Sequence, residues 1–167
     1  MELKLSQEFL TENDCYQAGR KIVPKGIMVH STGVAQPDPQ VFIRRWNKPG
    51  VEVCVHAFVA RDEVIQTLPW NWRGWHAGSG KNGSANNTHI GFEICEDDLT
   101  DKVYFRKVYR EAVELCAYLC KQYDLTEQDI ICHSEGYKKG IASNHGDVMH
   151  WFPKHSKSMD AFRAEVK

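Results

Sequence analysis

Two histidines at the ends of apolar segments are the residues whose type and position most directly indicate chemistry. His30 follows the short apolar run 27–29, which is typical of a buried strand, and turn residues come directly after it. His133 follows a second short strand-like segment, residues 129–132. A strand end holds a side chain rigidly, as a metal ligand requires, although a single histidine in such a place is often an ordinary half-buried residue.

A third ligand and a base would turn the two histidines into a catalytic zinc site. Such a site takes three protein ligands and leaves one position for water. Asp147 is our candidate for the third ligand, and His145 and His150 are its rivals. Glu93 points away from the apolar face of its strand, so it could act as a base on a water activated by zinc. The alternative is that Glu93 is only a carboxylate at the edge of the sheet.

The loop 69–78 is unusually rich in tryptophan, with Trp72 and Trp75 near its centre. These rings could simply cover the hydrophobic core. Loops that combine tryptophan with Asn and Arg also line grooves that bind sugars and peptides, because flat rings contact the apolar faces of sugars. The loop is therefore a candidate substrate contact.

Composition excludes several classes of protein. The 167 residues, 42% hydrophobic and 26% charged, are typical of one soluble globular domain. A net charge of -1 gives no electrostatic reason to expect nucleic acid, and no apolar run is long enough for membrane insertion. The N-terminus lacks the features of a secretion signal. The six cysteines form no CxxC pair, so we expect free thiols in a chain made in a reducing cytosol.

The order of periodic segments predicts an α/β fold. We expect helices over 14–20, 40–47, 101–123 and 159–166, strands over 27–29, 51–60, 64–68, 89–95 and 129–132, and polar loops over 79–88 and 136–144. This mixture suggests a single domain with a central mixed β-sheet flanked by α-helices. We expect residues 1–21 to be an N-terminal arm with a short helix, and the family resemblance described next implies that residues 22–167 are the catalytic domain.

Four segments, taken together, resemble a known family. Residues 26–32 (Gly-Ile-Met-Val-His-Ser-Thr), 55–59 (Val-His-Ala-Phe-Val), 74–78 (Gly-Trp-His-Ala-Gly) and 90–95 (Ile-Gly-Phe-Glu-Ile-Cys) come in the order and spacing of the Amidase_2 family. These are zinc-dependent N-acetylmuramoyl-L-alanine amidases, related to the peptidoglycan recognition proteins. The chain is similar to the catalytic domain of a bacteriophage or prophage endolysin.

The resemblance implies a set of zinc ligands. His30 and His133 match the first two ligands of the family. The third is a cysteine in many members and an aspartate in others, and no cysteine follows His133 in this chain. The His-x-Asp arrangement of residues 145–147 fits the second form, with Asp147 as the ligand and His145 as a donor to the oxyanion.

The resemblance also implies the remaining site residues. Glu93 matches the acidic catalytic residue of several members. Other members have a tyrosine near the position of His56, so this chain departs from that form. We expect the substrate to contact residues of the family segments and of the tryptophan-rich loop, namely His56, Trp72, Trp75, His76 and Ala77.

The activity implied is hydrolysis of the amide bond between the lactyl group of N-acetylmuramic acid and L-alanine, with one Zn²⁺ per chain. The expected partner is peptidoglycan, with no nucleic acid, no membrane insertion and a monomeric state. We expect the protein to be made in the bacterial cytoplasm without a signal peptide and to act on the cell wall after release or non-classical secretion. Two alternatives stay open: a peptidoglycan-binding module without catalysis, and a cytosolic amidase that recycles wall fragments.

Overall fold

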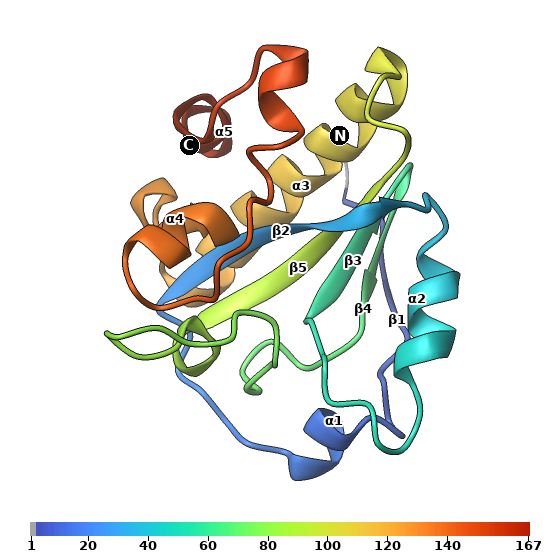
Figure 1. The fold of residues 1–167 in the computed structure, drawn as a ribbon, viewed down its shortest axis with the longest axis vertical. Helices are drawn as coiled ribbons and strands as arrows, with labels where there is room; N and C mark the ends of the chain where they lie inside the picture. The colour runs from blue at the N-terminus through green and yellow to red at the C-terminus, as the bar shows by residue number, and fades with distance from the viewer. Residues whose placement is uncertain (1–2) are drawn as a thin grey trace.

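The strands β2 (Gly26–Ala35) and β5 (His89–Glu96) run parallel and adjacent within a six-stranded sheet. The computed structural model describes residues 3–167, and Figure 1 shows the sheet with helices around it. The strand order is β1-β4-β3-β5-β2-β6, in which the other strands are β1 (Leu5–Gln7), β3 (Ala57–Ala60), β4 (Glu63–Gln66) and β6 (Ile130–Cys132). All neighbouring pairs are parallel except the hairpin β3–β4. The predicted mixed sheet flanked by helices is confirmed.

Four of the five α-helices within residues 3–167 were predicted, and side-chain caps explain where they begin. They are α1 (Asp14–Ala18), α2 (Pro39–Trp46), α3 (Lys102–Tyr123) and α5 (Met159–Val166). Asn13, Asp38, Asp101 and Ser158 accept hydrogen bonds from the free backbone N–H groups of their first turns. Short 3-10 turns cover Ala85–Asn87, Glu127–Asp129 and Phe152–His155. Within residues 3–167, no helix has the length and apolar character needed to cross a membrane.

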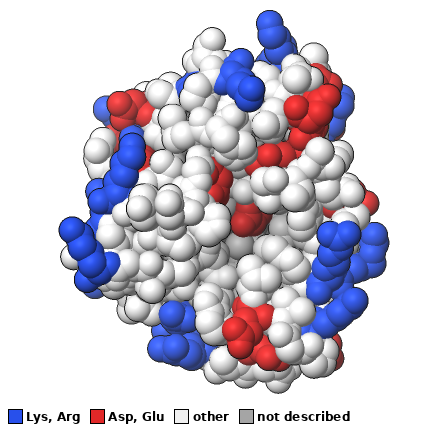
Figure 2. Space-filling model, in the orientation of Figure 1, with Lys and Arg blue, Asp and Glu red and all other residues white. Residues whose placement is uncertain are grey.

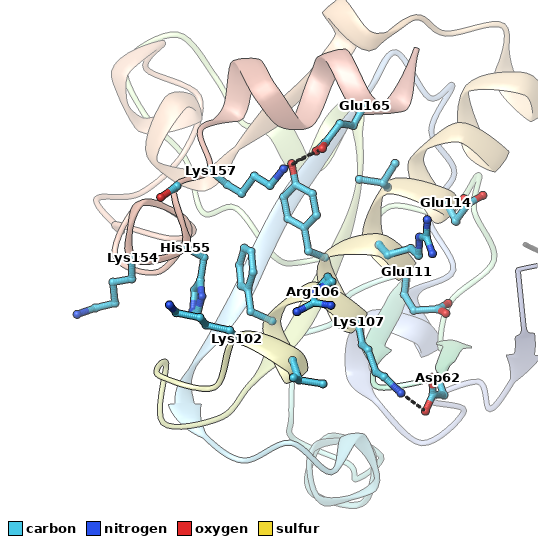
Figure 3. Close-up of a pocket in the computed structure, with 16 residues that line it drawn as sticks. Asp62, Lys102, Arg106, Lys107, Glu111, Glu114, Lys154, His155, Lys157 and Glu165 are labelled. Carbon is cyan, nitrogen blue, oxygen red and sulfur yellow. Dashed lines mark hydrogen bonds and ion pairs between the residues drawn. The ribbon is translucent and has the colours of Figure 1, made fainter.

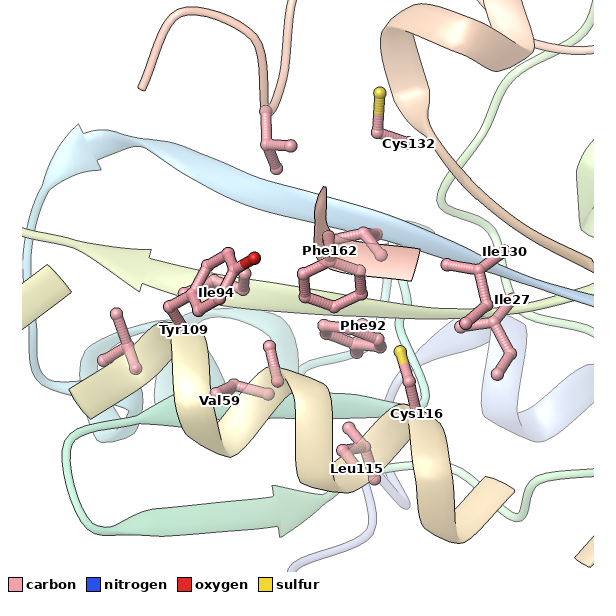
Figure 4. Packing of buried hydrophobic residues seen from close by; sticks show 14 of the residues in the cluster. Ile27, Val59, Phe92, Ile94, Tyr109, Leu115, Cys116, Ile130, Cys132 and Phe162 are labelled. Carbon is pink, nitrogen blue, oxygen red and sulfur yellow. The ribbon is translucent and has the colours of Figure 1, made fainter. Parts of the chain in front are cut away.

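Side chains along β5 point alternately to the two sides of the sheet, and the two sides have different surroundings. Ile90, Phe92 and Ile94 join the main core, which α3 and α5 cover from one side of the sheet (Figure 4). Each large apolar side chain buried in this way contributes about 1.5–3 kcal/mol. The residues between them, Gly91 and Glu93, therefore face the opposite side. The candidate site lies on that opposite side.

The strand that carries His30 is longer than predicted. We expected it to end at His30, but β2 continues to Ala35 with a register shift after Ser31. Gly33, at φ 74°, donates its N–H to the Glu96 carboxylate at 2.9 Å. The turn residues therefore form a bulge that keeps the strand paired with β5, rather than a turn that ends it.

The predicted strand over 51–60 is wrong in its first half. Only Ala57–Ala60 forms β3, because Cys54 pairs with Trp75 in an isolated bridge instead of with a strand of the sheet. The N–H of each of these two residues donates to the other's carbonyl, at 3.0 and 2.8 Å. Cys54 is thus held by the tryptophan-rich loop, the Val51 and Val53 carbonyls accept from residues 13–14, and Val55 joins the same core cluster as Cys54.

Two further elements were not predicted. The helix α4 (His133–Lys138) occupies the first part of the expected loop 136–144 and begins at the candidate ligand itself. The Glu135 carboxylate accepts the Cys132 N–H at 3.0 Å and also pairs with Arg163 of α5, which stabilises that first turn. The strand β1 lies within the predicted N-terminal arm and pairs with β4 at the edge of the sheet.

Candidate metal centre and active site

Parallel pairing of β2 and β6 brings the two candidate histidines together. Val29 lies opposite Cys132, so the next residue of each chain segment, His30 and His133, reaches the same point at the end of the strands. The Nδ1 atoms of the two rings are 3.0 Å apart. Asp147 contributes its carboxylate from the loop after α4, with Oδ2 at 3.3 Å from His30 Nδ1 and Oδ1 at 3.8 Å from His133 Nδ1.

These three residues form a group that could hold a metal ion. Their ligand atoms all lie within 4.8 Å of one another, and within residues 3–167 no other group of His, Cys, Asp and Glu does so. The Nε2 atom of His133 faces the Ser143 carbonyl oxygen at 3.0 Å. Because a carbonyl oxygen can only accept, Nε2 carries the proton and the Nδ1 lone pair points at His30 and Asp147. A lone pair aimed at a second imidazole nitrogen and a carboxylate fits a divalent cation such as zinc.

The electrostatics of the group suit metal binding. Burial, followed by the nearby His30, lowers the pKa of His133 to about 4, so this ring is neutral at pH 7, as a ligand must be. Burial alone would raise the pKa of Asp147, but the hydrogen bond and charge interaction with His30 outweigh it and lower that pKa. The backbone N–H of Ser31 also donates to Asp147 Oδ2 at 3.3 Å.

Glu93 lies beside His30 across the β2–β5 pair, in direct register. Its Oε2 atom is buried and has no hydrogen-bond partner among the described residues. Burial raises the pKa of Glu93 well above its ordinary value, and the negative charges of Asp147 and Glu96 add to this effect. A carboxyl group with a raised pKa holds a proton more readily than an ordinary carboxylate, which suits a group that accepts a proton beside a metal centre.

The two rivals of Asp147 lie outside the ligand group. His145 is exposed, and its Nδ1 atom hydrogen-bonds the Ser143 hydroxyl at 3.0 Å. Its ring centroid is 4.7 Å from that of His133, so it borders the site. His150 points elsewhere and pairs with Glu96 at 2.9 Å.

Four of the five expected substrate contacts fall into three environments. Trp75 is 43% exposed and available to a ligand. Trp72 is half-buried and contacts the Tyr16 ring and the Lys21 ammonium, which lies 3.7 Å from the centre of its ring. His56 and Ala77 are fully buried, so neither presents a surface to a substrate.

His76 contacts the ligand group rather than the open surface. Its Nδ1 atom is 2.9 Å from His30 Nε2, and its Nε2 atom is 3.2 Å from the His89 carbonyl oxygen. Ser143 and Asn86, which the sequence analysis did not single out, hold this region in place. The Ser143 N–H donates to the Ala77 carbonyl at 2.8 Å, and Asn86 Oδ1 accepts from His76 N and Ala77 N. Such backbone interactions leave no pattern in the sequence, apart from the Asn-rich loop itself.

The surface around the site is hollowed. Figure 2 shows acidic side chains at the centre of a depression on this face, with Lys and Arg mainly at its periphery. A groove of about 460 Å³ adjoins Ser143 and is lined by parts of 79–81 and 137–144. A second, larger cavity of about 980 Å³ is lined by α3, by residues 154–157, by Glu165 of α5 and by the hairpin residue Asp62 (Figure 3). It carries charges of both signs on the far side of the sheet and contains none of the site residues.

Comparison with known proteins identifies the family. The sequence profile of Amidase_2, described as N-acetylmuramoyl-L-alanine amidase, matches residues 19–150. The amidase XlyA of Bacillus subtilis (strain 168) is 31% identical over 133 residues, which cover 78% of this chain and 43% of XlyA. CwlH of the same organism is 28% identical over 133 residues, with 78% of this chain and 52% of CwlH covered. The chain thus spans about half or less of the length of these curated relatives.

Solved structures agree in fold. The catalytic domain of XlyA superposes with a TM-score of 0.78 and 27% sequence identity, covering 99% of this chain and 100% of that domain. The family profile extends over most of the chain and includes His30, Glu93, His133 and Asp147. This chain belongs to the Amidase_2 family of N-acetylmuramoyl-L-alanine amidases.

Proposed function

We propose that this protein is a zinc-dependent amidase that hydrolyses the bond between the lactyl group of N-acetylmuramic acid and L-alanine in peptidoglycan. The observation that carries the proposal is the convergence of His30 Nδ1, His133 Nδ1 and the Asp147 carboxylate beside the unpaired carboxyl of Glu93. Membership of the family supports the bond and the substrate. A bound zinc ion would supply Lewis acidity toward the amide carbonyl and a nucleophilic water at neutral pH.

The proton transfers are assigned to Glu93. An amide is a poor electrophile and an amine a poor leaving group, so the reaction needs a proton removed from water and then delivered to nitrogen. Glu93 has a buried oxygen without a partner and a raised pKa, which suit a group that accepts the first proton and returns it. The two carboxylates near Glu93 in residues 3–167 are already engaged, because Glu96 is bonded to Gly33 and His150 and Asp147 belongs to the metal group.

His145 and Trp75 complete the proposed assignment of roles. The exposed ring of His145 is tethered through Nδ1 to Ser143, which leaves Nε2 free to donate a hydrogen bond to the oxyanion of the tetrahedral intermediate. Trp75 is our remaining candidate for a direct aromatic contact with the substrate. We propose peptidoglycan as the partner, a monomeric enzyme, residues 22–167 as the catalytic unit, and action on the wall by a protein made in the cytoplasm.

Product analysis tests this function. Purified cell walls incubated with the zinc-loaded protein should gain new L-alanine amino termini and no new reducing sugars. The matched control is Glu93→Gln, which keeps the shape of the side chain but removes the base. New reducing sugars would make the enzyme a glycosidase, and binding to walls without cleavage would make it a non-catalytic module. Cleavage of soluble wall fragments but not of intact walls would favour a recycling amidase.

A further inference from the structure

His76 links the first candidate ligand to the neighbouring strand. Its imidazole lies between His30 Nε2, at 2.9 Å, and the carbonyl oxygen of His89 at the start of β5, at 3.2 Å. The rings of His30 and His76 meet edge to face, with an interplanar angle of 77°. Both nitrogens of His76 are therefore used within the protein, which leaves neither for a substrate.

The His89 carbonyl determines where the protons lie along this link. A carbonyl oxygen can only accept, so His76 Nε2 carries the proton and Nδ1 bears a lone pair. That lone pair faces His30 Nε2, which must then be the donor. The remaining nitrogen of His30, Nδ1, faces His133 and Asp147, where its lone pair would bind a metal ion. In the opposite tautomer of His76, the Nε2 lone pair would face a lone pair of the His89 carbonyl oxygen, and no hydrogen bond could form.

We infer that His76 is a positioning residue: it fixes the tautomer and the ring orientation of His30, so that His30 Nδ1 is available to a metal ion. The inference rests on the proposed zinc site. Ligating histidines commonly donate their second N–H to a carboxylate or a backbone carbonyl. His133 follows that pattern with Ser143, whereas His30 uses another histidine that is itself oriented by a carbonyl.

The surroundings hold His76 in this role. The Oδ1 atom of Asn86, a fully buried residue, accepts the backbone N–H groups of His76 and Ala77, each at 2.9 Å. The ring also lies against Gly91 of β5, where a Cβ atom would come within 2.5 Å of His76 Nδ1. The imidazole fits this position because residue 91 has no side chain, so both backbone and ring of His76 are set before any metal binds.

Loss of the acceptor nitrogen of His76 should weaken metal binding. His30 is buried, so without His76 its Nε2–H would have no partner and neither tautomer would be favoured. Changes to the partner of a ligating histidine typically reduce metal affinity by about 10–100-fold. We expect a loss of this size for His76→Leu, which removes both hydrogen bonds. His76→Asn should retain most of the affinity, because its side-chain oxygen can take the place of Nδ1.

Two measurements test the inference. Zinc affinity is measured by competition with a chelator for the wild type, His76→Leu, His76→Asn and the control His56→Asn. His56 is another buried histidine nearby, and its ring bonds the Trp72 carbonyl and the Gly91 N–H rather than a ligand. We expect similar zinc affinities for the wild type, His56→Asn and His76→Asn. The affinity of His76→Leu should be about 10–100-fold lower. Equal affinity for His76→Leu and wild type, or an equal loss in the His56 control, would overturn the inference.

The second measurement needs no metal and no variant. Long-range ¹H–¹⁵N correlation spectra of the metal-free wild type at pH 8 report which nitrogen of each neutral imidazole carries the proton. We expect the proton of His30 on Nε2 and that of His76 on Nε2. A His30 ring whose Nε2 carries no proton would overturn the inference even if His76→Leu fails to fold. If the wild type binds no zinc, the proposed function fails, while the tautomer of His30 still decides the role of His76.

Discussion

Glu93 and His30 are register partners in two adjacent parallel strands, and their side chains emerge on the same face of the sheet. The pairing of β2 with β5 thus places a buried carboxyl oxygen without a partner next to a candidate metal ligand. Because both residues lie within the most extensively paired part of the sheet, their relative position is set by the backbone ladder and not by a mobile loop.

This relationship predicts the behaviour of Glu93→Gln. The amide preserves the shape of the side chain but cannot take a proton from water, so turnover should fall by about 10²–10⁴. Zinc content, measured by metal analysis of the purified variant, should remain at the wild-type level. If zinc is lost together with activity, Glu93 is a ligand or a structural residue, and the base must be sought elsewhere.

His145→Ala should separate oxyanion stabilisation from metal binding. His145 borders the site but is not part of the ligand group, so the variant should keep its zinc. Loss of a donor to the oxyanion typically lowers the rate by about 10²–10³, and the loss should appear in kcat. A variant that turns over at the wild-type rate would show that His145 has no part in the reaction.

Asp147→Ala and His150→Ala should have opposite effects. Asp147 provides the carboxylate of the metal group, so its loss should remove both zinc and activity. His150 pairs with the buried Glu96, and without it that carboxylate keeps the Gly33 N–H as a partner. We expect His150→Ala to retain zinc and to lose roughly 1–2 kcal/mol of unfolding free energy, measured by urea titration. Zinc retained in Asp147→Ala but lost in His150→Ala would reverse the assignment.

The buried histidines should make the free energy of unfolding depend on pH. Burial lowers the pKa of His56 from 6.5 to about 4, and its Nδ1 atom accepts the Gly91 N–H, so protonation would break this bond. Below pH 6.5 the unfolded chain binds a proton that the folded chain does not, so stability falls as the pH drops from about 6.5 to about 4. At about 1.4 kcal/mol per pKa unit, the loss approaches about 3 kcal/mol.

Urea titrations from pH 8 to pH 4, with a chelator present throughout, measure this effect. His56→Asn should show a shallower decline of unfolding free energy than the wild type over the same interval. The residual slope is expected from other histidines, since partial burial also lowers the pKa of the half-buried His89 to about 4. Parallel curves for the variant and the wild type would show that His56 is not kept neutral by the fold.

Much of the fold and most of the metal group could be predicted from local patterns. The stripe of α3, the caps at Asp38 and Asp101, and the alternation in β5 are each set by neighbouring residues. The candidate ligands His30 and His133 could be found because apolar strands end near them. The third ligand could not be chosen from spacing alone; the family resemblance indicated Asp147, and the structure places it with the two histidines.

The errors arose where long-range partners decide the local structure. Residues 51–55 have the alternation of a strand, but Trp75 satisfies the backbone of Cys54, and only from His56 onward does the chain bond β5. The environment of His76 likewise depends on Gly91 and His89, which are distant in sequence. We expected His76 to contact substrate, and the structure shows both of its nitrogens engaged with the protein.

The identity of the metal group is tested most directly by anomalous diffraction from zinc-loaded crystals, recorded on both sides of the zinc absorption edge. The account predicts one strong anomalous peak per chain within coordination distance of His30 Nδ1, His133 Nδ1 and an Asp147 carboxylate oxygen, with Glu93 and His145 nearby but not coordinating. A peak coordinated by His145 or His150 in place of Asp147, or no peak at this position in a zinc-loaded crystal, would contradict it.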